Sequence, residues 1–179
     1  MHPFKRSAKK SMRLKHIQYS DLNSRQREIF NFQKVAAILA DYGFNCIKLA
    51  DDWQGADFLA YHIDGNNTLR VQPKGRLSID RKYVGKNLFM AFPSKSSWYL
   101  VEHDRLVELV SEHANWLNTS SWIDKGIYNS DAPNRLLLNA LEDFRLEPVA
   151  SSVLEYEEAE QGEAGQPPLA ALSATSPVI

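Results

Sequence analysis

The chain has 179 residues, of which 44% are apolar and 24% are charged, and its formal net charge is −1. This composition fits one globular domain and excludes a wholly disordered chain. No apolar run is long enough for a membrane helix, and the basic N-terminus lacks the apolar core of a secretory signal. The single cysteine, Cys46, excludes an internal disulfide, so we expect a cytoplasmic protein without a membrane span.

Charge is unevenly distributed along the chain. The first sixteen residues contain six Lys or Arg and no acidic residue, whereas residues 151–179 contain five Glu and neither Lys nor Arg. We therefore expect a loosely ordered basic arm at residues 1–20, a central domain at 21–148 and an acidic, disordered tail at 149–179. The arm is compatible with nucleic-acid binding and equally with a solvated, frayed terminus.

The first predicted element is a helix. Asn23, followed three residues later by Gln26, has the pattern of a capping box, and apolar residues then recur at helical spacing. Gly43 is a suitable left-handed end for this helix. Three strands are expected next, with a turn signal between the last two. They are predicted at residues 44–49, 57–63 and 68–74, with a loop at 50–55 and the turn at 64–67.

The second half of the chain begins with a polar connector rich in basic residues, at 77–87. After this connector we predict a strand pair around a turn at 93–96. A helix capped by Asp104 follows, and then a last helix. They are predicted at residues 88–92, 97–101, 105–115 and 134–144, while the stretch at 115–133 stays unassigned. This order predicts an α/β fold with a mixed central sheet and an added C-terminal helix.

The candidate chemistry lies in the strand pair at residues 55–76. Asp57 opens its first strand, and Gln72 and Lys74 close the second, where alternation puts them on one face with Arg70. Phosphodiester hydrolysis needs an activated water and neutralised phosphoryl charge, both of which Mg²⁺ or Mn²⁺ supplies. We expect Asp57, Gln72 and the carbonyl of Pro73 to be ligands of such an ion.

Two further groups of residues have expected roles around this ion. Glu28, on the first helix, would reach the metal directly or through water, and Lys74 would assist the attacking water or stabilise the developing negative charge. Basic residues nearby would bind phosphates, with Tyr83 as a sugar or base contact. These basic residues are Arg70, Arg76, Arg81, Lys82 and Lys86.

Glu28, Asp57 and Gln72-Pro73-Lys74, set on helix, strand and strand, resemble the active-site pattern of the PD-(D/E)XK nuclease superfamily, which includes restriction endonucleases and Holliday-junction resolvases. The resemblance covers residues 23–112. It implies a restriction-endonuclease-like α-β-β-β-α-β core, a Mg²⁺-dependent DNA nuclease activity and, as in many similar nucleases, a homodimer. It also implies that Asp57 is a metal ligand, Lys74 the lysine of the pattern and Glu28 its helix carboxylate.

The sequence departs from this pattern at two places. Gly55-Ala56 stands where the name of the motif has a proline, and Gln72 stands at the second acidic position. Gln72 lowers the negative charge of the site by one, which weakens metal binding unless Glu28 compensates.

Other interpretations stay open beside the nuclease. Asp57 would serve as a simple strand-start cap, Glu28 as a solvated first-turn carboxylate, and Lys74 with Arg76 as a solvated strand end. Asp51 and Asp52 are expected to be loop residues, or either of them a support of the metal's outer shell. For the whole chain, the alternatives are a catalytically silent DNA-binding module on the same fold, or an interaction protein without a nucleic-acid role.

Overall fold

The computed structural model describes residues 13–148, so the predicted acidic tail and most of the predicted basic arm lie outside the described residues. The first element is the 3-10 helix η1 (Tyr19–Asp21). In chain order the other elements are α1 (Ser24–Asp41), β1 (Phe44–Trp53), β2 (Ala56–His62), β3 (Thr68–Pro73), β4 (Leu77–Asp80), η2 (Arg81–Tyr83), β5 (Leu88–Ser94), β6 (Ser97–Glu102), α2 (His103–His113), η3 (Trp116–Asn118), α3 (Ser120–Lys125), β7 (Ile127–Ser130), α4 (Arg135–Ala140), η4 (Glu142–Phe144) and β8 (Arg145–Leu146).

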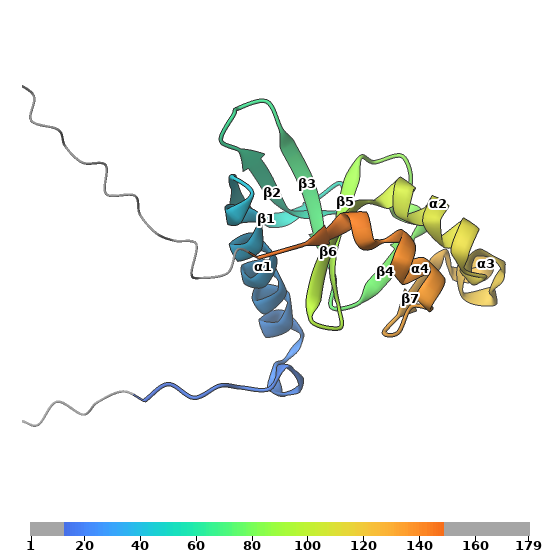
Figure 1. Cartoon of the computed structure of the whole chain (residues 1–179), viewed down its shortest axis with the longest axis horizontal. Coiled ribbons are helices and arrows are strands. Elements are labelled where there is room, and N and C mark those ends of the chain that lie inside the picture. Colours follow the sequence, from blue (N-terminus) through green and yellow to red (C-terminus); the bar gives the residue numbers. More distant parts are fainter. Residues whose placement is uncertain (1–12, 149–179) are drawn as a thin grey trace, which may run out of the picture. The chain divides into compact units, whose positions relative to one another are not determined.

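Six strands form one mixed sheet in the spatial order β1-β2-β3-β5-β6-β8, and Figure 1 shows this sheet between α1 and the other helices. β3 and β5 run parallel, and the remaining neighbouring pairs are antiparallel. β4 and β7 form a separate two-stranded antiparallel sheet. The prediction of a mixed α/β fold is confirmed, and most of its strand pairs are antiparallel.

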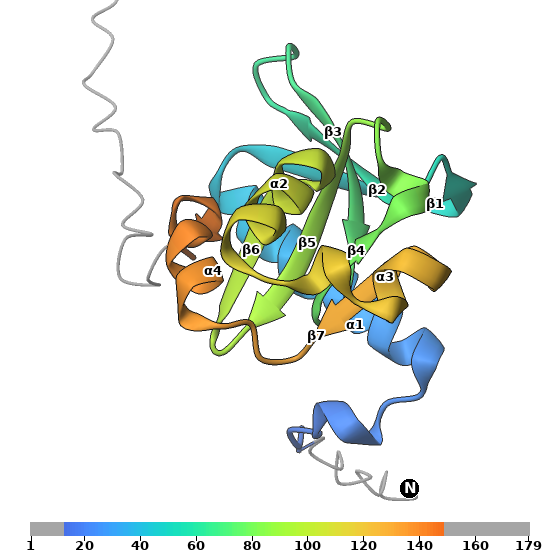
Figure 2. The same ribbon diagram turned by 90° about the vertical axis from the view of Figure 1, so that its right-hand side faces the viewer.

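Apolar residues cover both faces of the large sheet. Val35 and Leu39 of α1 belong to one buried cluster, and residues of α2 and α4 belong to another. Along β5, Ala91 lies in the first cluster while Met90 and Phe92 lie in the second, as the alternation of a strand requires. Figure 2 accordingly shows α2 in front of β5 and β6, with α1 behind them.

The predicted start and end of α1 are confirmed. Asn23 Oδ1 accepts a hydrogen bond from Gln26 N at 2.9 Å, and Asn23 N donates to Gln26 Oε1 at 2.9 Å, which completes the capping box. Just past the helix, Gly43 has a φ of +79°, and a Cβ there would lie 2.9 Å from His62 Nε2. The prediction of a loose arm is wrong at its end, since Tyr19 Oη accepts a hydrogen bond from Asn31 Nδ2 at 3.0 Å.

β1 is longer than predicted. It continues to Trp53, and only Gln54 and Gly55 remain as a turn before β2. Residues 50–53 are exposed, and β1 stands at the edge of the sheet. Polar side chains are tolerated at such a place, so this part of the strand has the composition of a loop.

The predicted polar connector is wrong in its first half. Leu77, Ser78 and Ile79 are buried in β4, with exposed fractions of 1%, 2% and 0%. β4 pairs with β7, which lies in the stretch that the sequence left unassigned. The α-helix that the resemblance implies before the fourth core strand is also missing here, since within residues 13–148 only β4 and the 3-10 helix η2 stand between β3 and β5.

The last elements differ from the prediction mainly in their bounds. α2 begins at His103, so Asp104 lies in its first turn instead of capping it, and the carboxylate accepts a hydrogen bond from Gly85 N at 2.9 Å. The last helix is shorter than the predicted 134–144: Asn134 caps α4, its Oδ1 accepting a hydrogen bond from Leu137 N at 2.9 Å, and the helix ends at Ala140. Within residues 13–148, no helix is both long and apolar enough to cross a membrane.

Candidate active site

One cleft brings together side chains of α1, β2 and the end of β3. Glu28, Asp57, Gln72, Pro73 and Lys74 all line it, and its volume is about 530 Å³. The five residues predicted for the metal and the catalytic lysine therefore share one hollow surface, although they are far apart in the sequence. The other lining residues are Tyr19, Ser24, Arg27, Asn31, Asp52, Gly75, Lys82 and Tyr83.

Gln72 is the centre of a chain of hydrogen bonds in this cleft. Its side chain is 5% exposed, and its Nε2 donates to Asp57 Oδ2 at 2.7 Å and to the Pro73 carbonyl at 3.3 Å. The Tyr83 hydroxyl donates to Gln72 Oε1 at 3.1 Å, and Lys74 Nζ donates to the Tyr83 oxygen at 3.4 Å. The buried amide thus has a partner for both its nitrogen and its oxygen, as burial requires.

The strand register places Asp57 beside Gln72. Phe58 pairs with Val71 in the antiparallel β2–β3 ladder, so the residues that precede Phe58 and follow Val71 are neighbours. Pro73 is the last residue of β3, a strand end being where a residue without an N–H is tolerated. The chain then leaves the ladder with Lys74 N donating to the Ala91 carbonyl at 2.8 Å.

Asp57 and Glu28 differ in their electrostatic surroundings. Burial raises the pKa of Asp57, and the hydrogen bond from Gln72 and the charges of Lys48 and Lys74 only partly oppose this rise. A hydrogen bond from Lys48 lowers the pKa of Glu28, with Arg25 acting in the same direction. Asp57 is therefore the carboxylate that a nearby positive charge would stabilise most.

Lys48 is a site residue that the sequence did not single out. Its Nζ lies 2.7 Å from Glu28 Oε1, while Arg25 Nη1 lies 3.3 Å from Glu28 Oε2. Lys48 pairs with Phe58 in the β1–β2 register, which brings its ammonium to the carboxylates of α1 and β2. The sequence does indicate that Lys48 lies on a strand close to the one that carries Asp57. The local pattern does not show which strand pairs with which, or in what register.

Asp52 also belongs to this surface rather than to a distant loop. It lines a small hollow of about 130 Å³ together with Glu28, Lys48 and Asp57, and its Oδ1 accepts a hydrogen bond from Gly55 N. Even so, the part of the chain that the structure describes has no group of three or more His, Cys, Asp or Glu placed to hold a metal ion. A cation in this cleft would therefore need neutral oxygen ligands as well.

Tyr83 has a different place from the predicted one. It is 2% exposed, so its ring is part of the core and only its hydroxyl reaches the cleft. A Cβ at Gly55 would lie 2.7 Å from Tyr83 Cε1, and Gly55 has a φ of +95°. The turn before β2 therefore needs glycine, and the Tyr83 ring packed against it positions the hydroxyl that holds Gln72.

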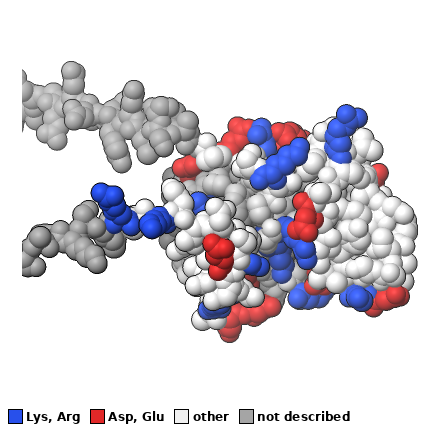
Figure 3. Space-filling view, turned by 90° about the horizontal axis from the view of Figure 1, so that it is seen from below, with Lys and Arg blue, Asp and Glu red and all other residues white. Residues whose placement is uncertain are grey.

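The predicted phosphate-binding residues do not gather in one place. Lys82 lines the cleft, and Arg76 lines an adjoining hollow. Arg70 instead donates to Gln54 Oε1 at 2.9 Å and to the Lys86 carbonyl, and Arg81 donates to the Trp122 carbonyl at 2.6 Å. Figure 3 shows a face of the molecule on which Lys and Arg side chains gather near the middle, with acidic side chains among and around them.

No protein-family model matches this chain, and no curated protein sequence matches it. The residues of the cleft and their geometry are therefore the basis on which a function can be argued.

Proposed function

We propose that the chain is a divalent-metal-dependent nuclease that hydrolyses phosphodiester bonds in DNA. The observation that carries the proposal is the lining of one cleft by a partly buried carboxylate, a buried amide, a backbone carbonyl and an ammonium group. Bound Mg²⁺ or Mn²⁺ would neutralise phosphoryl charge and lower the pKa of a water molecule.

The donor atoms of the cleft fit such an ion. Asp57 Oδ2 and the Pro73 carbonyl both accept hydrogen bonds from Gln72 Nε2, at 2.7 and 3.3 Å. This amide nitrogen, with its partial positive charge, stands where a cation would meet the same two oxygens. A half-turn of the amide would present Oε1 to the cation and let Nε2 donate to the Tyr83 hydroxyl, which can accept as well as donate. Asp57, Gln72 and Pro73 would hold the ion, with Glu28 bound to it directly or through water.

The chain's own groups would act on the phosphate as follows. A water oxygen attacks phosphorus in line while the bond to the leaving sugar oxygen breaks, the water gives a proton to solvent, and the leaving oxygen takes one up. The Lys74 ammonium, held by the Tyr83 hydroxyl at 3.4 Å, would stabilise the negative charge on the phosphoryl oxygens. Lys82 would contact the backbone phosphates beside the cleft.

A restriction-endonuclease-like core is the finer part of this proposal. The order α1, β1, β2 and β3, followed by β5 parallel to β3, supports it. The 3-10 helix η2 in place of an α-helix before β5 counts against it. The homodimer and the cytoplasmic location stay predictions from the sequence.

The test is hydrolysis of supercoiled plasmid DNA by purified protein with Mn²⁺. We expect nicking, and we expect Asp57→Asn and Lys74→Met each to slow it by about 100-fold or more, because each removes a group that acts on the developing charge. Asp124→Asn, which changes an exposed carboxylate on α3, is the matched control and keeps full activity. Nicking that survives both cleft substitutions would assign the activity to another site or to a contaminant.

A catalytically silent DNA-binding module is the second candidate. The observation that favours it is the pairing of Glu28 with Lys48 and Arg25, which satisfies this carboxylate without a metal. Calorimetry separates the two functions. A nuclease binds Mn²⁺ in a manner that Asp57→Asn abolishes, a silent module shows only salt-dependent DNA binding, and an interaction protein without a nucleic-acid role shows neither.

A further inference from the structure

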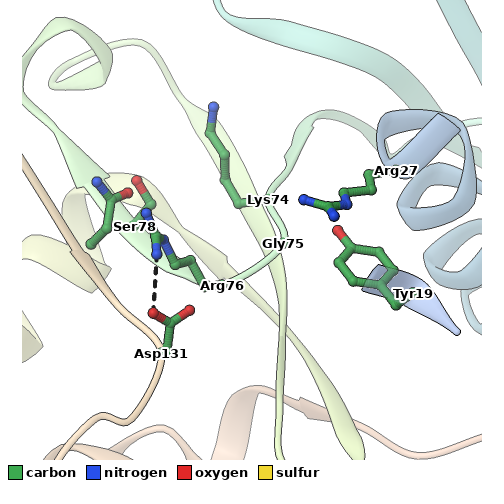
Figure 4. A pocket seen from close by; sticks show the side chains of 8 residues that line it. Tyr19, Arg27, Lys74, Gly75, Arg76, Ser78 and Asp131 are labelled. Carbon is green, nitrogen blue, oxygen red and sulfur yellow. Dashed lines mark hydrogen bonds and ion pairs between the residues drawn. The ribbon is translucent and has the colours of Figure 1, made fainter. Parts of the chain in front are cut away.

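The hollow that Arg76 lines adjoins the cleft and has a volume of about 290 Å³. The two share the lining residues Tyr19, Arg27, Lys74 and Gly75, and the hollow is completed by Arg76, Ser78, Asn129 and Asp131. Figure 4 shows Arg76, Ser78 and Asp131 on one side, Tyr19 and Arg27 on the other, and Lys74 between them. The volume of the hollow lies near the lower end of the roughly 300–1,000 Å³ typical of ligand pockets.

The charge of this hollow favours an anion. Three of its lining side chains, Arg27, Lys74 and Arg76, are cationic, and only Asp131 is anionic. Guanidinium groups form planar, charge-assisted hydrogen bonds that match phosphate oxygens. An anion with several acceptor oxygens would therefore complement the lining better than a neutral ligand.

Arg27 has an unused donor beside this hollow. Its Nε is buried and has no hydrogen-bond partner among residues 13–148, although its Nη2 donates to the Ser20 carbonyl at 2.9 Å. The guanidinium also lies over the Tyr19 ring, 5.4 Å from its centroid, which restrains its position. Buried donors normally have partners, so this Nε departs from the usual pattern. Because the atom itself is buried, a ligand in the hollow would meet the terminal nitrogens of the Arg27 guanidinium.

Arg76 is held by a carboxylate that a ligand can replace. Arg76 Nη1 lies 3.0 Å from Asp131 Oδ2, but the two side chains are 50% and 79% exposed. Ion pairs this exposed are weak and screened by salt. A phosphate entering the hollow could take over the Arg76 guanidinium while Asp131 turns to solvent.

We propose that this hollow is a second phosphate site, which holds the nucleic-acid phosphate next to the one in the cleft. Its position relative to the scissile bond rests on the proposed function, because Lys74 would then stand between the two phosphates. The ligand chemistry is a phosphate group flanked by a sugar, supplied either by the continuous backbone or by a phosphorylated strand end. The substrate would therefore carry two successive phosphates rather than a single phosphodiester.

The test measures binding without hydrolysis. A fluorescein-labelled duplex is titrated in EDTA at several salt concentrations, and the slope of log Kobs against log salt is compared between variants. Each lost phosphate contact lowers the magnitude of the slope by about 0.9. We expect Arg76→Gln and Arg27→Gln each to weaken binding by about tenfold and to show this smaller slope, whereas Asp131→Asn binds more tightly than wild type.

Arg105→Gln is the matched control, since Arg105 makes an exposed ion pair with Glu108 at 2.9 Å on α2 and lines neither hollow. A merely structural role of Arg76 would leave the slope unchanged. Wild-type slopes in both Arg76→Gln and Arg27→Gln, or no DNA binding at all, would overturn the second phosphate site.

The source of the phosphate is decided by comparing duplexes that carry a 5′-phosphate or a 5′-hydroxyl. Tighter binding of the phosphorylated end that Arg76→Gln removes assigns the hollow to a strand end, and equal binding with the slope effect retained assigns it to the continuous backbone. The failure of this inference is distinguishable from that of the nuclease. Metal-dependent nicking with unchanged slopes contradicts only the second phosphate site, and changed slopes without nicking contradict only the nuclease.

Discussion

The core under α2 and α4 and the cleft beside α1 both contain buried residues, but of opposite kinds. The buried members of the core cluster are apolar or aromatic, and Leu137 of α4 and Leu141 just past its end are fully buried. In the cleft a buried polar residue, Gln72, has its amide satisfied by Asp57 and Tyr83. Tyr83 links the two regions, because its ring lies in the core while its hydroxyl lies in the cleft. Burial of apolar surface stabilises the fold, whereas burial of the amide sets the position of groups that a ligand can use.

The largest expected effect is on the core side of this comparison. Leu137→Ala removes a fully buried side chain and should lower the free energy of unfolding by about 2–5 kcal/mol, measured by urea denaturation. The neighbouring Leu136 is 62% exposed, so Leu136→Ala should change the free energy of unfolding by no more than about 0.5 kcal/mol. Equal losses in the two variants would show that the core does not carry the stability assigned to it.

An intermediate effect is expected from Gln72→Glu, which adds a carboxylate beside Asp57. Two adjacent carboxylates repel one another without a metal and attract a hard cation, so we expect Mn²⁺ affinity to rise by about tenfold or more. Calorimetry measures the affinity, and urea denaturation without metal should show a lower stability near neutral pH. Gln33→Glu makes the same change at an exposed position of α1 and should leave Mn²⁺ binding unaltered, so an unchanged affinity in Gln72→Glu would argue against a metal in the cleft.

The smallest effect is a difference between Asp57 and Glu28 in how the stability of the protein depends on pH. The two contributions change with pH in opposite directions. The pKa of Asp57 is raised above its ordinary value of 3.8 by burial, so its contribution to stability is present below that value and is lost as the pH rises through the folded pKa. The pKa of Glu28 is lowered below 4.5 by Lys48, so its contribution is present above 4.5 and is lost as the pH falls through the folded pKa.

Urea denaturation between about pH 3 and about pH 7 checks this difference. Relative to wild type, Asp57→Asn should become more stable as the pH rises, and Glu28→Gln less stable. If the stability of both variants relative to wild type changed in the same direction with pH, burial would not be the main influence on the pKa of Asp57.

The features predicted best from the sequence are those with local signals. The capping box at Asn23 and the end of α1 before Gly43 depend on neighbouring residues, and the structure has both. The convergence of Asp57 and Gln72 also followed from local information, since a short turn between two strands fixes their register. The bounds of α2 and α4 were wrong because apolar spacing alone does not mark the last turn of a helix.

The features that were missed depend on partners far away in the chain. The sequence predicts a connector where the structure has β4, because the partner strand β7 lies in a stretch without clear periodicity. Lys48 gains its place in the site from Glu28, which lies on α1. Arg70 and Arg81 are predicted as phosphate contacts because they are basic residues near the site. In the structure they donate to the Gln54 side chain and to the Trp122 carbonyl instead. A basic residue is available to a ligand where the fold leaves its donors without protein acceptors or pairs them only with an exposed group, as Asp131 does for Arg76.

The sequence by itself determined the mixed α/β class, the capping box at Asn23 and the strand pair that carries Asp57 and Gln72, with Lys74 just past its end. These depend on backbone preferences and on residues close together in the chain. Only the tertiary structure decided that Tyr83 holds the Gln72 amide, that Lys48 neutralises Glu28, and that Arg27 and Arg76 face one hollow. The physical reason is that hydrogen bonds, burial and ion pairing depend on distances in space, which the packing of the helices and strands sets.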